Sequence, residues 1–256
     1  MDPAALYPMA LPILIMGIAF LYSSVGFGGA SGYLAAMSLF AIAPQIMAST
    51  ALTLNVLVAS IAFIAFYRAG HLNWRLLWPF LLTSIPAAFI GGYLQIDEQI
   101  YLVLLNVALT YVAIRMLFNE YFTRPIADIE SDSFSLPLAL GAGLGIGLLS
   151  GMIGVGGGIF LAPLIVVTGW GTAKQAAAIA AAFILLNSLS GIAGRWMADQ
   201  YAMDGLGLIV LPAGFIGGMA GSHLGARYLS GAAMRRLLGV ILLVAVTRLW
   251  ITLLPN

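Results

Sequence analysis

Two glycine-rich segments occupy corresponding places in the two halves of the chain. The first reads VGFGGA at positions 25–30, and the second reads IGVGGG at positions 153–158. Glycine permits positive φ angles and a close approach of the backbone to another group. A helix that begins after such a turn presents N–H groups without partners, and these groups and the helix dipole favour an anion. The two segments are therefore candidates for an anion-binding site.

A few polar side chains accompany these segments in otherwise apolar sequence. Serines flank the first glycine segment, and an asparagine recurs at a similar place in each half. Arg195 follows the second asparagine and is a candidate countercharge for an anion. The predicted substrate-binding residues are Ser24, Gly26, Gly28, Gly29, Ser31, Asn55, Gly154, Gly156, Gly157, Gly158, Asn187 and Arg195.

Each of these residues also has a purely structural interpretation. Glycines in membrane helices often allow close packing, and the four-residue spacings 143/147/151 and 217/221/225 fit that use. A buried asparagine can bridge helices by hydrogen bonds. An arginine near a helix end can extend its side chain to the membrane interface.

The composition places these residues in a membrane. Of the 256 residues, 62% are hydrophobic and 7% are charged, with a mean hydropathy of +1.06. Soluble domains usually carry about 25% charged residues. The charges are too few to cover a water-facing surface, so most of the surface must face lipid.

The apolar sequence divides into segments that are long enough to cross a bilayer as helices. They run over residues 9–42, 46–67, 76–94, 100–118, 136–167, 176–197, 206–229 and 237–254. A polar stretch at 119–135 interrupts them near the midpoint. We predict an all-α polytopic membrane protein with a first membrane repeat at 1–118, a polar linker at 119–135 and a second membrane repeat at 136–256.

A second motif supports the duplication and suggests its orientation. The sequence PAAFIGG at 86–92 corresponds to PAGFIGG at 212–218. The loop before the first copy is basic and the loop after it is acidic, whereas the second half reverses this order. Because short cytoplasmic loops carry excess Lys and Arg, the reversal predicts inverted repeats with both termini periplasmic. Each repeat would hold a glycine-broken helical hairpin and three spanning helices.

Several functions are disfavoured by what the chain lacks. It has no cysteine, and neither histidine has a second metal-binding residue near it in sequence. No Asp or Glu lies deep in an apolar segment, and a net charge of +1 offers no basic face for nucleic acid. We therefore predict no enzyme activity, no metal, no cofactor and no nucleic-acid partner.

The paired glycine segments, the two Pro-x-x-x-x-Gly-Gly elements, the chain length and the acidic central linker resemble the sulfite exporter TauE/SafE family of membrane transporters. The resemblance implies transport of a small anion, such as sulfite or an organosulfonate, across the bacterial plasma (inner) membrane. Inverted repeats suit a secondary transporter that works by alternating access. A proton or sodium is a candidate coupling ion, and a homo-oligomer is a candidate assembly. A channel-like facilitator and a non-transporting membrane subunit remain the alternatives.

Overall fold

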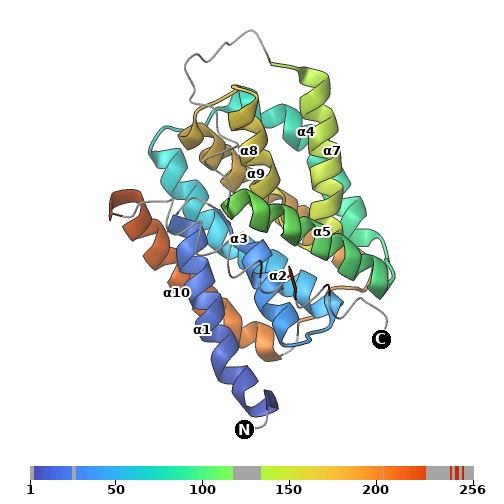
Figure 1. The fold of residues 1–256 in the computed structure, drawn as a ribbon. Coiled ribbons are helices and arrows are strands. Elements are labelled where there is room, and N and C mark those ends of the chain that lie inside the picture. Colours follow the sequence, from blue (N-terminus) through green and yellow to red (C-terminus); the bar gives the residue numbers. More distant parts are fainter. Residues whose placement is uncertain are drawn as a thin grey trace.

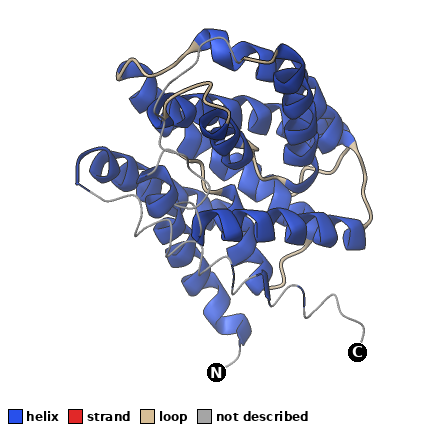
Figure 2. Cartoon of the chain, turned by 45° about the horizontal axis from the view of Figure 1, so that its top comes forward, coloured by secondary structure: helices blue, strands red, loops and turns tan. Residues whose placement is uncertain are grey.

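A computed structural model describes residues 3–24, 27–117, 134–203 and 205–228, together with residues 243, 246, 247 and 250. All regular structure in these ranges is helical, which confirms the predicted all-α class (Figure 2). Gly26, nearly all of the predicted linker 119–135 and most of the last apolar segment lie outside the described residues.

The helices of the two predicted repeats follow one another in the same order. The first repeat contains α1 (Pro3–Ser24), α2 (Ala30–Leu39), α3 (Pro44–Arg68), α4 (Trp74–Tyr93) and α5 (Glu98–Leu117). The second contains α7 (Leu136–Ile153), α8 (Gly158–Val167), α9 (Ala173–Met197) and α10 (Gly205–Tyr228). Thus α1 to α4 correspond to α7 to α10.

Four of the described helices are long and apolar enough to cross a membrane: Pro44–Arg68, Trp74–Tyr93, Leu136–Ile153 and Lys174–Met197. Shorter apolar helices occupy Ala10–Ser24, Glu98–Ile114, Gly158–Val167 and Gly207–His223. The chain is thus a multi-pass membrane protein. The apolar segments predicted at 9–42 and 136–167 are each divided in two by a glycine turn.

At both glycine turns the chain folds back on itself. In the first repeat, a Cβ atom on Gly32 of α2 would lie 2.5 Å from Ile18 Cγ2 of α1. In the second, the rings of Phe134 and Trp170 lie 4.9 Å apart at the open end of the α7–α8 pair. Each pair of helices is therefore a hairpin, with the glycine turn at its closed end.

The two repeats exchange helices in their packing. Helix α1 lies along α10, and its counterpart α7 lies along α4 (Figure 1). Glycines bring these backbones together: Gly147 of α7 lies against the backbone of Ser84, and Gly217 of α10 lies against that of Met16. Small residues allow this close approach within a membrane. Each predicted repeat therefore packs its first described helix against a helix of the other.

Helices α3 and α9 are corresponding elements, and they pack against each other in opposite directions. Three contacts define their relative direction: Leu52 lies near Gly191, Asn55 bonds Ser188, and Ser49 accepts a hydrogen bond from Ala202. As the residue number rises along α3, it falls along α9.

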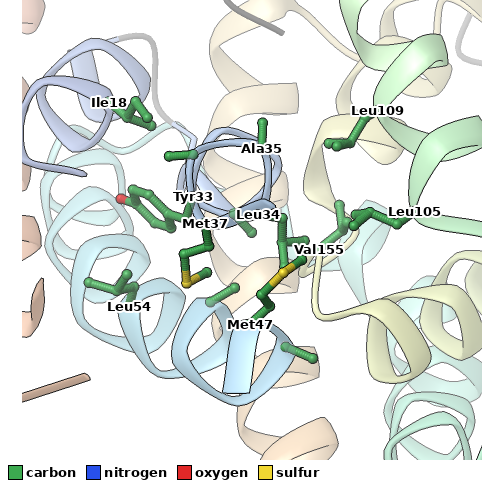
Figure 3. Close-up of a cluster of buried hydrophobic side chains, with 14 of the residues drawn as sticks. Ile18, Tyr33, Leu34, Ala35, Met37, Met47, Leu54, Leu105, Leu109 and Val155 are labelled. Carbon is green, nitrogen blue, oxygen red and sulfur yellow. The ribbon is translucent and has the colours of Figure 1, made fainter. Parts of the chain in front are cut away.

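Two apolar clusters surround this crossing. One gathers the inner faces of α1, α2, α3 and α5, with Tyr33, Leu34 and Met37 of α2 at its centre (Figure 3). The other gathers α4, α8 and α9 around Phe80 and Phe183. Burial of these side chains fixes both short helices, α2 and α8, at their positions beside the crossing.

Candidate functional site

The first glycine turn, before α2, has hydrogen bonds within its own hairpin. Phe27 N–H donates to the Tyr22 carbonyl at 2.9 Å, and the Tyr33 hydroxyl donates to the Gly28 carbonyl at 2.8 Å. The Tyr22 and Ser31 hydroxyls lie 2.7 Å apart. Gly29, which precedes α2, has a φ of 100°, a conformation that glycine adopts without steric cost.

The second glycine turn, before α8, depends on glycine at three positions. Gly154, Gly156 and Gly157 have φ angles of 85°, 77° and 76°. A Cβ atom on Gly157 would also lie 2.7 Å from Ile146 Cγ2. Glycine is therefore required at these three positions by backbone conformation and by space together.

The two turns meet at one place between α3 and α9. A Cβ atom on Gly28 would lie 2.7 Å from Asn55 Oδ1 and 3.0 Å from Ile184 Cγ2. On Gly156 it would lie 3.0 Å from the same Ile184 atom and against Asn55 Nδ2. Equivalent glycines of the two repeats thus contact the same pair of side chains.

Asn55 is the polar group at this meeting point. It is fully buried, and its Nδ2 donates to the Val155 carbonyl and to the Ser188 hydroxyl, each at 3.4 Å. Among the described residues, its Oδ1 has no hydrogen-bond partner. A buried amide oxygen without a partner is costly in a membrane, and this one is an acceptor that no donor fills in the part of the chain that the structure describes.

Two helices begin beside this point without a side-chain cap. The N–H groups that begin α2 and α8 have no N-cap side chain to which they could donate, because the N-cap residues are Gly29 and Gly157. The first N–H groups of a helix have no partner within the helix. Both helix starts are buried, so the positive ends of two helix dipoles lie close to Asn55.

Arg195 lies on the face of α9 that carries Ile184 and Ser188. It is buried, and its Nη2 donates to the carbonyls of Gly151 at 3.2 Å and Met152 at 2.6 Å. These carbonyls end α7, where a cation is favourable. The side chain therefore neither extends to the interface nor presents Nη2 to a solute.

The other predicted site residues do not all lie at the meeting point of the two turns. Ser24 Oγ donates to the carbonyl of Leu21 within α1. Asn187 is fully buried, but it donates to the Phe183 carbonyl of its own helix, and no described residue bonds its Oδ1. Gly158 lies against Ile184, whereas Gly26 is outside the described residues.

Asn55 and Asn187 do not occupy the same position along their helices. Asn55 is the twelfth residue of α3, and the twelfth residue of α9 is Ile184. This agrees with the contacts, because Asn55 and Ile184 flank both turns. Asn55 alone therefore contacts both glycine turns, and the corresponding residue of α9 is the apolar Ile184.

Sequence reasoning missed Ile184, which contacts both turns, and two residues that form hydrogen bonds with these elements. Ser188, a partner of Asn55, is adjacent in sequence to the predicted Asn187. Tyr101 of α5 donates through its hydroxyl to the Ile153 carbonyl at 3.2 Å, and no sequence pattern indicated it. The Tyr101 bond exists only because α5 packs near the end of α7, and these helices are distant in sequence.

A surface cavity of about 370 Å³ lies at the ends of α4 and α9, lined by Tyr93, Leu94, Gln95, Met197, Ala198 and Asp199. It does not include the residues of the glycine turns. Among the described residues, no group of three His, Cys, Asp or Glu side chains could hold a metal ion.

Comparison with known proteins identifies relatives over nearly the whole chain. The family model "Sulfite exporter TauE/SafE" matches residues 11–249. The chain is 37% identical over 237 residues to the "Probable membrane transporter protein y4hK" of Sinorhizobium fredii, which covers 93% of this chain and 96% of that protein. No solved structure matches.

Proposed function

The chain belongs to the sulfite exporter TauE/SafE family of membrane transporters, and from this we propose that it is a secondary carrier of a small anion. Sulfite and organosulfonates are the first candidate solutes. The family assignment makes the chain a transporter of a small solute and not an enzyme. The anion, the site and the mechanism are our proposal.

One observation carries the proposed site: Gly28 and Gly156 contact the same Asn55 and Ile184. A solute held there would touch both repeats at once. This arrangement suits a transporter, because movement of one repeat against the other would change access while the solute stays bound. The proposed ligand groups are backbone N–H groups of both turns other than those of Phe27, Gly158 and Phe160, which already donate to carbonyls. Asn55 holds the second turn through its bond to the Val155 carbonyl.

The electrostatics of this place favour negative charge. Two helix N-termini without side-chain caps lie beside Asn55. Arg195 adds a buried positive charge on the same face of α9, and no carboxylate among the described residues forms an ion pair with it. Since its Nη2 binds carbonyls, Arg195 acts through its field and not as a direct ligand.

We propose that the repeats are inverted and that access alternates by their relative movement. The antiparallel packing of α3 on α9 supports this orientation, because the two helices are corresponding elements. The reciprocal pairing of α1 with α10 and α7 with α4 is the pattern that a pseudo-two-fold axis produces. Such an axis in the membrane plane relates inverted repeats.

The charged loops suggest how the protein sits in a bacterial plasma membrane. Arg68 ends α3, and Lys174 lies in the first turn of α9, at the end where the α7–α8 hairpin opens. Asp97 and Asp199 follow the C-terminal ends of α4 and α9, which lie at the other end of the helices from Arg68 and Lys174. By the preference of Lys and Arg for the inner side, the first end is cytoplasmic. Both chain termini are then periplasmic.

Flux into proteoliposomes tests the proposal. Sulfite, an organosulfonate and a carboxylate are compared with and without imposed proton and sodium gradients. We expect saturable uptake of an anion that a gradient drives. Flux that rises without saturation and ignores both gradients would instead indicate a channel-like facilitator. No flux of any of these anions would reject the proposed solute class.

A further inference from the structure

The orientation of the Asn55 amide is fixed by the second glycine turn. Its Nδ2 donates to the Val155 carbonyl at 3.4 Å, and a carbonyl can only accept. If the amide were reversed, two acceptor oxygens would face each other there. The Ser188 hydroxyl, also 3.4 Å from Nδ2, suits either orientation because it can donate and accept. Oδ1 is therefore the acceptor of this side chain, and it lies against Gly28 of the first turn.

A glycine leaves this oxygen uncovered by any side chain of the first turn. A Cβ atom on Gly28 would lie 2.7 Å from Oδ1, so any other residue at this position would cover the oxygen. Asn55 is fully buried, and none of the residues that the structure describes donates to Oδ1. The neighbouring Ile184 is apolar and cannot donate. Because a buried acceptor without a donor is costly, a ligand that brings a donor gains by binding here.

The same place also favours negative charge, because α2 and α8 begin beside Asn55 with glycine as their N-cap residues. The two demands differ. An anion that carries only acceptors satisfies the helix ends but opposes Oδ1, which has a partial negative charge. A neutral donor satisfies Oδ1 but not the helix ends. A solute that has both a negative charge and a hydrogen-bond donor satisfies both.

We infer that Asn55 is a specificity-determining residue: its Oδ1 accepts a hydrogen bond from the solute, so the transported anion carries a donor of its own. This inference rests on the proposed anion-carrier function and narrows its solute class. Hydrogen oxyanions such as hydrogensulfite belong to this class, as do sulfonates that bear a hydroxyl or ammonium group. The sulfite dianion and the simple alkanesulfonates have no donor and are excluded from it.

Sulfonates of equal charge and similar size test this inference in proteoliposomes. Hydroxyethanesulfonate has a donor, ethanesulfonate has none, and methoxyethanesulfonate keeps the extra oxygen but cannot donate. At low solute concentration, we expect the flux of hydroxyethanesulfonate to exceed that of each of the others at least about tenfold, because a buried acceptor discriminates against a solute that leaves it unpaired. Equal fluxes, or a preference for ethanesulfonate, would overturn the inference.

Binding in detergent assigns the preference to Asn55. The rise of the thermal unfolding temperature with solute concentration reports binding without transport. Hydroxyethanesulfonate should half-saturate this rise at a concentration about tenfold lower than ethanesulfonate does. Asn55→Leu should remove the difference between the two sulfonates, whereas Asn187→Leu, the same change at another fully buried asparagine of the crossing, should keep it. A difference that persists in Asn55→Leu would reject Oδ1 as its source. If Asn55→Leu does not insert, the solute comparison with the unmodified protein still decides.

Flux and binding together distinguish failure of this inference from failure of the proposed function. If hydroxyethanesulfonate binds more tightly than ethanesulfonate but no anion is transported, the acceptor role of Asn55 stands and the carrier function falls. If anion flux is saturable but the sulfonates bind and move alike, the acceptor role falls and the carrier function stands. If no sulfonate binds and no anion moves, both fall.

Discussion

Gly28 and Gly156 are equivalent residues of the two repeats, and both lie against the side chain of Asn55. A Cβ atom on Gly28 would come within 2.7 Å of Asn55 Oδ1, and each glycine would bring one to 3.0 Å from Ile184 Cγ2. The two turns are thus joined through one asparagine. The first two predictions follow from this contact.

Alanine at either glycine should block transport. Gly28→Ala and Gly156→Ala place a methyl group where the Asn55 amide lies, and Gly156 also has a positive φ. We expect flux to fall at least about tenfold, because a displaced ligand group loses interactions worth more than 1.4 kcal/mol. Flux in proteoliposomes measures this, with quantified insertion. Gly17→Ala, which has open space on α1, is the matched control, and equal flux in all three would refute the site.

The two asparagines should differ in their effect. Asn55→Leu removes the bonds to Val155 and Ser188 and the free amide oxygen, so flux should be lost. Asn187→Leu removes only a bond within its own helix and no bond to either glycine turn, so flux should be largely retained. Flux in both variants is compared with that of the unmodified protein. A stronger loss in Asn187→Leu would place the solute on the other side of α9.

Neighbouring glycines of α7 should have opposite effects on stability. Gly147 packs against the backbone of Ser84, whereas Gly145 faces open space. Gly147→Ala should lower the thermal unfolding temperature in detergent, since overpacking costs about 1–3 kcal/mol. Gly145→Ala should leave it unchanged or raise it slightly, because alanine favours the helix. A similar unfolding temperature for both variants would contradict the close packing of α7 on α4.

Single cysteines in the loops should report the inverted arrangement. Cysteine at His71 and at Lys174 should react with an impermeant thiol reagent from one side of the membrane, and cysteine at Asp97 and at Asp199 from the other. His71 and Asp199 lie in corresponding loops, after α3 and after α9. Parallel repeats would label these two positions from the same side, which would reject the model.

The predicted class and duplication were available from sequence because they depend on local properties. Long apolar segments require helices in lipid, and the recurrence of two motifs in order indicates two repeats. The division of each long segment at its glycines was also predicted, and it follows from the preference of glycine for positive φ. These properties belong to short stretches of chain and do not depend on distant neighbours.

The composition of the candidate site could be predicted only in part. The glycines and Asn55 were identified as candidates, but nothing local indicated that Gly28 and Gly156 share one partner, that Ile184 is the counterpart of Asn55, or that Tyr101 and Arg195 bind the end of α7. Those contacts exist only because the hairpins fold back and α3 crosses α9. Packing between segments far apart in the chain decides them, since a side chain's partner in the interior depends on which helices meet and at what level.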